Sequence, residues 1–236
     1  MNHLIAHRGL KKEAKENTLK AFEECLNNPH YVGFECDVRT TKDHVFVICH
    51  NPIYKGKIIS LTNYKELKKD NIPLLENVLK LKTNKIILLE IKEMNCDIKH
   101  LSIILQKYEY QNIYVMSFYN RIINNLALNN LKIKVGVLNY VLNSENDYQN
   151  YDFICLLENI MTSHLENYFI SQNKEVFIYG IHHLEKMVKD HAESFGASEE
   201  FKAWLNNSCV FLCSLVDRIV PGYPRENAEE VFETLG

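Results

Sequence analysis

The chain has 236 residues, of which 46% are hydrophobic, with 27 basic and 30 acidic residues and a formal net charge of −3. This composition is typical of a globular protein with one sizeable core, and the length falls within the range of a single α/β barrel. A near-neutral charge gives no electrostatic case for nucleic acid or an anionic membrane as the main partner.

The cysteines and the N-terminus bear on where the protein works. Seven cysteines are scattered along the chain without CxxC or zinc-type spacing, which is typical of reduced core thiols in a cytosolic protein. Met1 is followed almost at once by the first predicted strand, and no apolar run reaches the length of a membrane span. We therefore expect a cytoplasmic protein with no signal peptide and no stable membrane insertion.

Short apolar runs alternate with helical patterns along most of the chain. Seven parallel strands are predicted at His3–Ala6, in the first half of Gly33–His50, and at Lys85–Lys92, Ile113–Ser117, Ile133–Leu138, Asp152–Leu157 and Glu175–Tyr179. Helices are predicted after Asn17-Thr18, at Tyr64–Lys68, from Pro73, and at Ile98–Tyr108, Tyr119–Asn129 and Ser163–Gln172. Repeated strand–helix units imply a mostly parallel sheet with right-handed crossovers.

The stretch Gly33–His50 predicts two short strands around a turn at Thr41–His44. Alternation of side chains places Glu35 and Asp37 on one face of the first strand. If the two strands pair antiparallel, positions whose numbers sum to about 85 lie opposite each other, and His50 falls beside Glu35. Two carboxylates and a histidine suit a hard divalent cation with an acid/base group next to it. The alternative is a surface hairpin whose polar side chains face solvent.

Polar residues stand at or just after the ends of several predicted strands. They are His7 and Arg8, Glu35 and Asp37, Glu90 and Lys92, and Ser117. Charged side chains from the carboxyl ends of several strands are what the active site of a (β/α)8 barrel requires. A doubly wound open sheet also gathers ligands at strand ends, but no glycine-rich phosphate loop follows the first strand. We therefore predict an α/β fold, a TIM-type (β/α)8 barrel.

The last fifty residues differ in composition from the rest. Ser208–Val216 is apolar enough for an eighth strand, whereas Glu199–Val220 fits one or two helices equally well. The last barrel strand is therefore expected to be atypical or missing. The predicted division is a barrel over residues 1–184 with a small insertion at about 51–72, followed by an atypical helical segment over 185–236.

Several motifs occur together in a specific order and spacing. They are His7-Arg8-Gly9, Glu16-Asn17-Thr18, Gly33-x-Glu35-x-Asp37, His50, Glu90-Ile91-Lys92, Ser117-Phe118 and Val176-Phe177-Ile178-Tyr179. Taken together, they resemble the glycerophosphodiester phosphodiesterase family over about residues 3–182. Any one motif alone would be a weak signal.

The resemblance implies a fold, an activity and a set of site residues. The fold is a triose-phosphate-isomerase-type barrel, and the activity is metal-dependent hydrolysis of glycerophosphodiesters to sn-glycerol 3-phosphate and an alcohol. The site residues it implies are the metal ligands Glu35, Asp37 and Glu90, the acid/base pair His7 and His50, and the substrate or phosphate contacts Arg8, Lys92, Ser117 and Tyr179.

The chemistry needs the same residue types. A divalent cation together with Arg8 and Lys92 would neutralise the phosphodiester, and an all-oxygen ligand set suits Mg²⁺ or Ca²⁺. One histidine would activate the nucleophile while the other protonates the leaving alcohol. The expected partner is a small glycerophosphodiester, and a homodimer through the barrel helices is the base-rate expectation.

Purely structural alternatives exist for individual residues. Glu90 and Lys92 could form a rim ion pair, Ser117 could bond the backbone, and Asn17-Thr18 could cap a helix. Two functional alternatives also stand. One is a phosphodiesterase for another head group or a capsule-type polymer, and the other is a catalytically impaired barrel that binds phosphodiesters or a protein partner.

Three features depart from the family pattern. Asn51 follows His50 where the family usually has aspartate, and His44 stands where a glycine is usual, at a turn position expected to need a positive φ. Residues 185–228 resemble an internal piece of tagaturonate reductase or mannitol-type polyol dehydrogenases. Because that piece comes without the nucleotide-binding domain, no dehydrogenase activity is expected from it.

Overall fold

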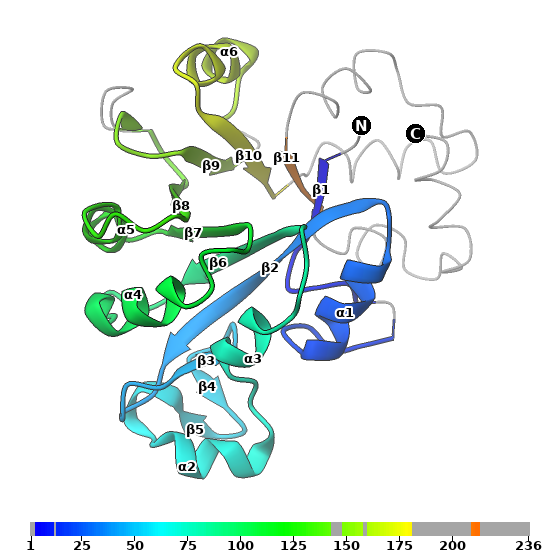
Figure 1. Ribbon diagram of the computed structural model, residues 1–236, viewed down its shortest axis with the longest axis vertical. Coiled ribbons are helices and arrows are strands. Elements are labelled where there is room, and N and C mark those ends of the chain that lie inside the picture. Colours follow the sequence, from blue (N-terminus) through cyan, green and yellow to red (C-terminus); the bar gives the residue numbers. More distant parts are fainter. Residues whose placement is uncertain (1–2, 12, 143–147, 158–159, 181–208, 213–236) are drawn as a thin grey trace.

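The computed structural model describes residues 3–11, 13–142, 148–157, 160–180 and 209–212 (Figure 1). Eight parallel strands form a ring: β1 (His3–Ala6), β2 (Tyr31–Thr40), β6 (Ile86–Ile91), β7 (Ile113–Ser117), β8 (Lys134–Asn139), β9 (Phe153–Leu157), β10 (Glu175–Tyr179) and β11 (Cys209–Leu212). The ring closes because β1 pairs with both β2 and β11. The predicted TIM-type barrel is confirmed.

The eighth position of the ring is filled by β11, which pairs in parallel with β1 and with β10. Of the two readings that the sequence left open for this region, the strand is therefore confirmed for Cys209–Leu212. The other residues of the predicted helical segment over 185–236 lie outside the described part of the chain. The division at residue 184 stays a prediction.

Helices lie around the outside of the strands (Figure 1). They are α1 (Leu19–Asn27), α3 (Leu75–Leu79), α4 (Ile98–Gln106), α5 (Asn120–Ala127) and α6 (Ser163–Ser171). Side-chain oxygens of Thr18, Asp97 and Thr162 cap the starts of α1, α4 and α6 by accepting backbone N–H bonds. These caps satisfy N–H groups that have no partner within the helix, which is why the helices begin there.

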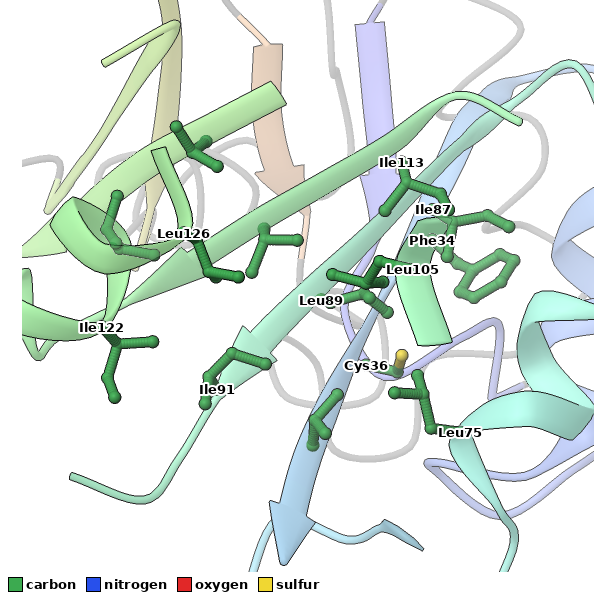
Figure 2. Close-up of a cluster of buried hydrophobic side chains, with 14 of the residues drawn as sticks. Phe34, Cys36, Leu75, Ile87, Leu89, Ile91, Leu105, Ile113, Ile122 and Leu126 are labelled. Atoms are coloured by element: carbon green, nitrogen blue, oxygen red, sulfur yellow. The ribbon is translucent and has the colours of Figure 1, made fainter. Parts of the chain in front are cut away.

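Strand alternation divides the apolar residues into two layers. Odd and even positions of a strand point to opposite faces. The outward positions pack against the helices, and Figure 2 shows Phe34, Cys36, Ile87 and Leu89 of β2 and β6 in this layer with Leu105 of α4. The inward positions fill the barrel with Ile5, Ile86, Leu88, Tyr114, Met116, Leu138, Phe153, Cys155 and Phe177. The inward face of β6 is therefore apolar at Ile86 and Leu88 and becomes polar at Glu90, whereas the inward face of β2 is polar from Glu35 onward.

The predicted hairpin forms between β2 and β3 (Phe46–Ile48), which pair antiparallel at Val38–Ile48 and Thr40–Phe46. These pairs sum to 86 rather than 85, and the ladder ends before His50, so the expected pairing of His50 with Glu35 is wrong. His44 in the turn has φ of 60°, as predicted.

The insertion after His50 is a small subdomain with its own secondary structure. It contains the hairpin of β4 (Ile53–Tyr54) and β5 (Lys57–Ile58), the 3₁₀ turns Ile59–Leu61 and Lys68–Asp70, and helix α2 (Tyr64–Leu67). The sequence predicted α2 but not the hairpin, because two-residue strands are too short to show alternation. In Figure 1 the subdomain lies beyond the carboxyl end of β2.

Candidate active site

Three buried carboxylates converge inside the barrel mouth. Asp37 of β2 lies directly beside Glu90 of β6 in the sheet, and Glu35 stands one inward position before Asp37. One carboxylate oxygen from each residue lies within 4.8 Å of the others. The convergence expected from the sequence is confirmed, because alternation points all three side chains to the same face of neighbouring strands.

Asp37 stands at the centre of a network of donors. Its carboxylate lies 3.3 Å from Arg8 Nε and 3.3 Å from Lys92 Nζ, and it accepts a 2.7 Å hydrogen bond from Asn17 Nδ2. Burial alone would raise the pKa of Asp37, but Lys92 and Arg8 hold it below the ordinary value. Asp37 is therefore an anion at neutral pH.

The other two carboxylates are less well compensated. Glu35 is fully buried and accepts a 2.9 Å bond from the Arg8 backbone N–H. Burial, followed by repulsion from Asp37 and Glu90, raises the pKa of Glu35 well above its ordinary value. Glu90 accepts a 2.6 Å bond from Lys92 Nζ, yet burial still raises its pKa. With all three carboxylates ionised, the site would carry one more negative charge than Arg8 and Lys92 neutralise, and without a further cation that excess favours a proton on one of the glutamates.

The oxygen set fits a hard divalent cation. Glu35 Oε1 and Asp37 Oδ1 are buried and have no hydrogen-bond partner among the described residues. Two oxygens on opposite sides of a Ca²⁺ ion lie roughly 5 Å apart, twice the usual Ca–O distance of about 2.3–2.6 Å. The observed spacing lies within that limit. A cation would provide a partner for Glu35 Oε1 and a second charged partner for Asp37 Oδ1, which lies 3.3 Å from Lys92 Nζ.

Two imidazoles flank the carboxylates. His7 Nε2 lies 3.9 Å from Glu35 Oε2, and burial, aided by the charge of Arg8, lowers the pKa of His7 to about 3. Burial also lowers the pKa of His50, although Asp37 opposes the shift. His50 Nδ1 lies 3.1 Å from Asn51 Oδ1, so a proton on Nδ1 would be bonded by the amide oxygen and Nε2 would be left with its lone pair.

The four predicted substrate contacts fall into two groups. Arg8, Lys92 and Tyr179 belong to the barrel mouth, and Tyr179 packs edge-on against the stacked rings of Phe118 and Tyr140. Ser117 does not join them. Its side chain is fully buried, donates to Ile91 O at 2.8 Å and accepts from Tyr119 N at 3.1 Å. Alternation along β7 turns Ser117 toward the helices, so the structure favours the backbone-bonding alternative.

Asn17, which belongs to one of the motifs and could also have capped a helix, lies beside Asp37. Thr18 alone caps α1, whereas Asn17 has φ of 56° and turns its amide toward Asp37. The amide donates to Asp37 Oδ2 at 2.7 Å and accepts from the Asp37 backbone N–H at 3.2 Å. The signal in the sequence was an asparagine directly before a cap residue, since asparagine tolerates the left-handed region.

Replacing Asn17 with alanine is expected to weaken metal binding about tenfold to a hundredfold, because outer partners of a ligating carboxylate orient it. Thr18→Ala is the matched control, since it removes the helix cap at a cost of about 1 kcal/mol without touching Asp37. Titration with Mg²⁺ by calorimetry would measure both variants. Equal affinities in the two variants would show that Asn17 does not orient the ligand.

The family model and the solved structures agree on one family. The sequence model described as the Glycerophosphoryl diester phosphodiesterase family matches residues 7–213. A glycerophosphodiester phosphodiesterase from Parabacteroides distasonis superposes with a TM-score of 0.73 at 19% identity, covering 99% of this chain and 98% of that one. A phosphodiesterase from Oleispira antarctica, solved with the product sn-glycerol-3-phosphate, gives 0.70 at 17% identity, covering 91% and 96%.

A second similarity is confined to a short segment. Fifty-three residues, 22% of the chain, are 43% identical to the altronate oxidoreductase of Halalkalibacterium halodurans, and they span 10% of that enzyme. This agrees with the resemblance to an oxidoreductase fragment that the sequence showed. The chain thus covers about a tenth of the length of these curated relatives.

No helix in the described part of the chain has the length and apolar character to cross a bilayer.

Proposed function

The chain belongs to the glycerophosphoryl diester phosphodiesterase family, and from that premise we propose that it hydrolyses small glycerophosphodiesters with the help of a divalent metal ion. The products would be sn-glycerol 3-phosphate and an alcohol. The observation that carries the proposal is the meeting of three buried carboxylates from two neighbouring strands, with two cations and two imidazoles around them.

The metal-binding residues in this proposal are Glu35, Asp37 and Glu90. When bound there, Mg²⁺ or Ca²⁺ supplies positive charge to a phosphoryl oxygen. The all-carboxylate ligand set favours these hard cations over zinc, which prefers nitrogen and sulfur ligands.

Arg8 and Lys92 are proposed to bind the phosphate. Both lie beside Asp37, so a phosphodiester that binds at the mouth would meet two cations next to the carboxylate cluster. Their charge offsets the negative charge that otherwise repels a nucleophile from the phosphodiester. Tyr179, with Phe118 and Tyr140, provides an apolar wall for the carbon skeleton of the substrate.

The two histidines are proposed to move the protons. Burial lowers the pKa of both, so both begin as neutral imidazoles near pH 7. One neutral imidazole accepts a proton from the attacking hydroxyl and becomes imidazolium. The other must first take up a proton from solvent, and as imidazolium it delivers that proton to the leaving alkoxide and returns to the neutral form.

The test is metal-dependent release of sn-glycerol 3-phosphate from glycerophosphocholine. We expect turnover with Mg²⁺ or Ca²⁺, loss of turnover after chelation, and recovery when the metal is returned. Glycerophosphoethanolamine and glycerophosphoglycerol would serve as second substrates. No turnover of any of the three, with bound metal demonstrated by calorimetry, would favour the impaired barrel, for which Asn51 is the motivating feature.

A further inference from the structure

Arg39 makes a set of contacts that the proposed reaction does not use. Its Nε and Nη2 donate to the backbone carbonyl of His50 at 2.9 and 2.5 Å, and its Nη1 donates to Glu93 Oε1 at 2.7 Å. Glu93 Oε2 in turn accepts from the Thr40 backbone N–H at 3.2 Å. The side chains of Arg39 and Glu93 are only 11% and 18% exposed. This is a largely buried, charge-assisted clamp on one carbonyl.

The clamp joins segments that come from separate strands. Arg39 stands on β2 two residues beyond Asp37, and Glu93 stands three residues beyond Glu90 at the end of β6. His50 belongs to the segment after β3, whose pairing with β2 ends at Ile48. The clamp therefore fixes the segment that carries the histidine against the two strands that carry the carboxylates.

Holding the His50 carbonyl also restricts the main chain from which its side chain projects. The carbonyl belongs to the peptide plane that links His50 to Asn51, and the Asn51 amide oxygen meets His50 Nδ1. On the other side, the Cys49 N–H donates to the Asp37 carbonyl at 2.9 Å. The main chain is thus bonded at the peptide group that follows His50 and at the one that precedes Cys49, which holds the His50 backbone beside the strand that carries Asp37.

We propose that Arg39, anchored by Glu93, is a positioning residue that sets the place of His50 relative to the metal-binding carboxylates. The proposal rests on the proposed function, in which His50 moves a proton. Arg39 acts through the main chain of His50, so its removal changes proton transfer without removing any ligand or phosphate contact.

Arg39→Lys is the principal variant. It keeps the charge opposite Glu93 but loses the planar fork that reaches the carbonyl and Glu93 together. We expect kcat to fall about tenfold to a hundredfold, as for other outer partners of site residues, while KM and Mg²⁺ affinity stay within about twofold. Arg121→Lys, at an exposed position at the start of α5, is the matched control and should match wild type.

Two further measurements separate positioning from a loss of folding. In Arg39→Ala, millimolar guanidinium should restore part of the lost kcat by occupying the space between the His50 carbonyl and Glu93. The imidazole NMR signals of His50, assigned by their absence in His50→Gln, should shift in Arg39→Lys and stay unchanged in Arg121→Lys. Glu93→Gln keeps an acceptor for Arg39 and should lose less activity than Arg39→Lys.

Unchanged kcat and unchanged His50 signals in folded Arg39→Lys would overturn the proposal. So would a loss confined to thermal stability, or a rise in KM that explains the whole effect. If wild-type protein hydrolyses no glycerophosphodiester, the proposed function fails. The NMR comparison then still decides whether Arg39 positions His50.

Discussion

Replacing His7 or His50 with alanine is expected to lower kcat about 10²- to 10⁴-fold, the usual contribution of a positioned acid or base. His7 Nε2 lies 3.9 Å from Glu35 Oε2, and the charge of Asp37 acts on His50. Among the described residues, the side chains that could hold a cation together are Glu35, Asp37 and Glu90, without either histidine. Metal affinity should therefore survive in both variants. Steady-state hydrolysis of glycerophosphocholine and calorimetric Mg²⁺ titration would measure the two quantities separately.

His30→Ala is the matched control, because His30 is exposed and lies in the turn before β2. It should retain wild-type turnover and metal affinity. Retained turnover in both His7→Ala and His50→Ala would refute the acid/base assignment. Loss of metal binding together with turnover would instead make the histidines part of the ligand set.

Glu35→Gln is expected to abolish metal-dependent turnover while stabilising the metal-free protein. Glu35 is fully buried, one of its oxygens has no hydrogen-bond partner among the described residues, and two further carboxylates lie nearby. A neutral amide removes this repulsion and can still accept the Arg8 N–H. We expect a gain of about 1–3 kcal/mol, the usual cost of a buried unsatisfied polar group, or several degrees in Tm.

The pH dependence of the same variant follows from the direction of the shift. Burial raises the pKa of Glu35 above its unfolded value, so the folded state binds more protons than the unfolded state in the pH range between the two values. Stability of the metal-free protein therefore falls as pH rises through that range. Glu35→Gln has no such proton to lose, so its advantage over wild type should grow from about pH 4.5 upward.

Thermal unfolding in a chelator and in saturating Mg²⁺ would check both expectations. Metal should raise the Tm of wild type, because it binds only the folded state, and should raise that of Glu35→Gln much less. Glu23→Gln, at an exposed position of α1, is the control and should leave Tm unchanged in both conditions. A lower Tm for Glu35→Gln than for wild type in the chelator would contradict the electrostatic argument.

Regular elements were largely predictable because their signal is local. The predicted bounds of β1, β7 and β10 agree with the structure, since each is an apolar run that meets polar residues at both ends. Alternation in β2 correctly placed Glu35 and Asp37 together on the inward face. The same rule, applied across β7, would have turned Ser117 outward, because Tyr114 and Met116 are the inward residues of that strand.

Contacts between segments distant in sequence were harder to predict from the sequence. Asn17 stands beside Asp37 only because its backbone takes the left-handed conformation, which an Asn-Thr pair permits but does not require. Arg39 reaches both His50 and Glu93, which lie 11 and 54 positions further along the chain. Such bonds depend on the path that each loop takes between strands, and that path leaves no periodic pattern in the sequence.

By itself, the sequence determined the barrel class, the family and the three carboxylates, because alternation along a strand and the order of the motifs are properties of the chain alone. The tertiary structure decided which strand closes the ring and which polar side chains bond to Asp37. It also decided that Ser117 faces away from the site. The physical reason is that closure and side-chain networks depend on register between strands, and register is a property of pairs of segments rather than of either one.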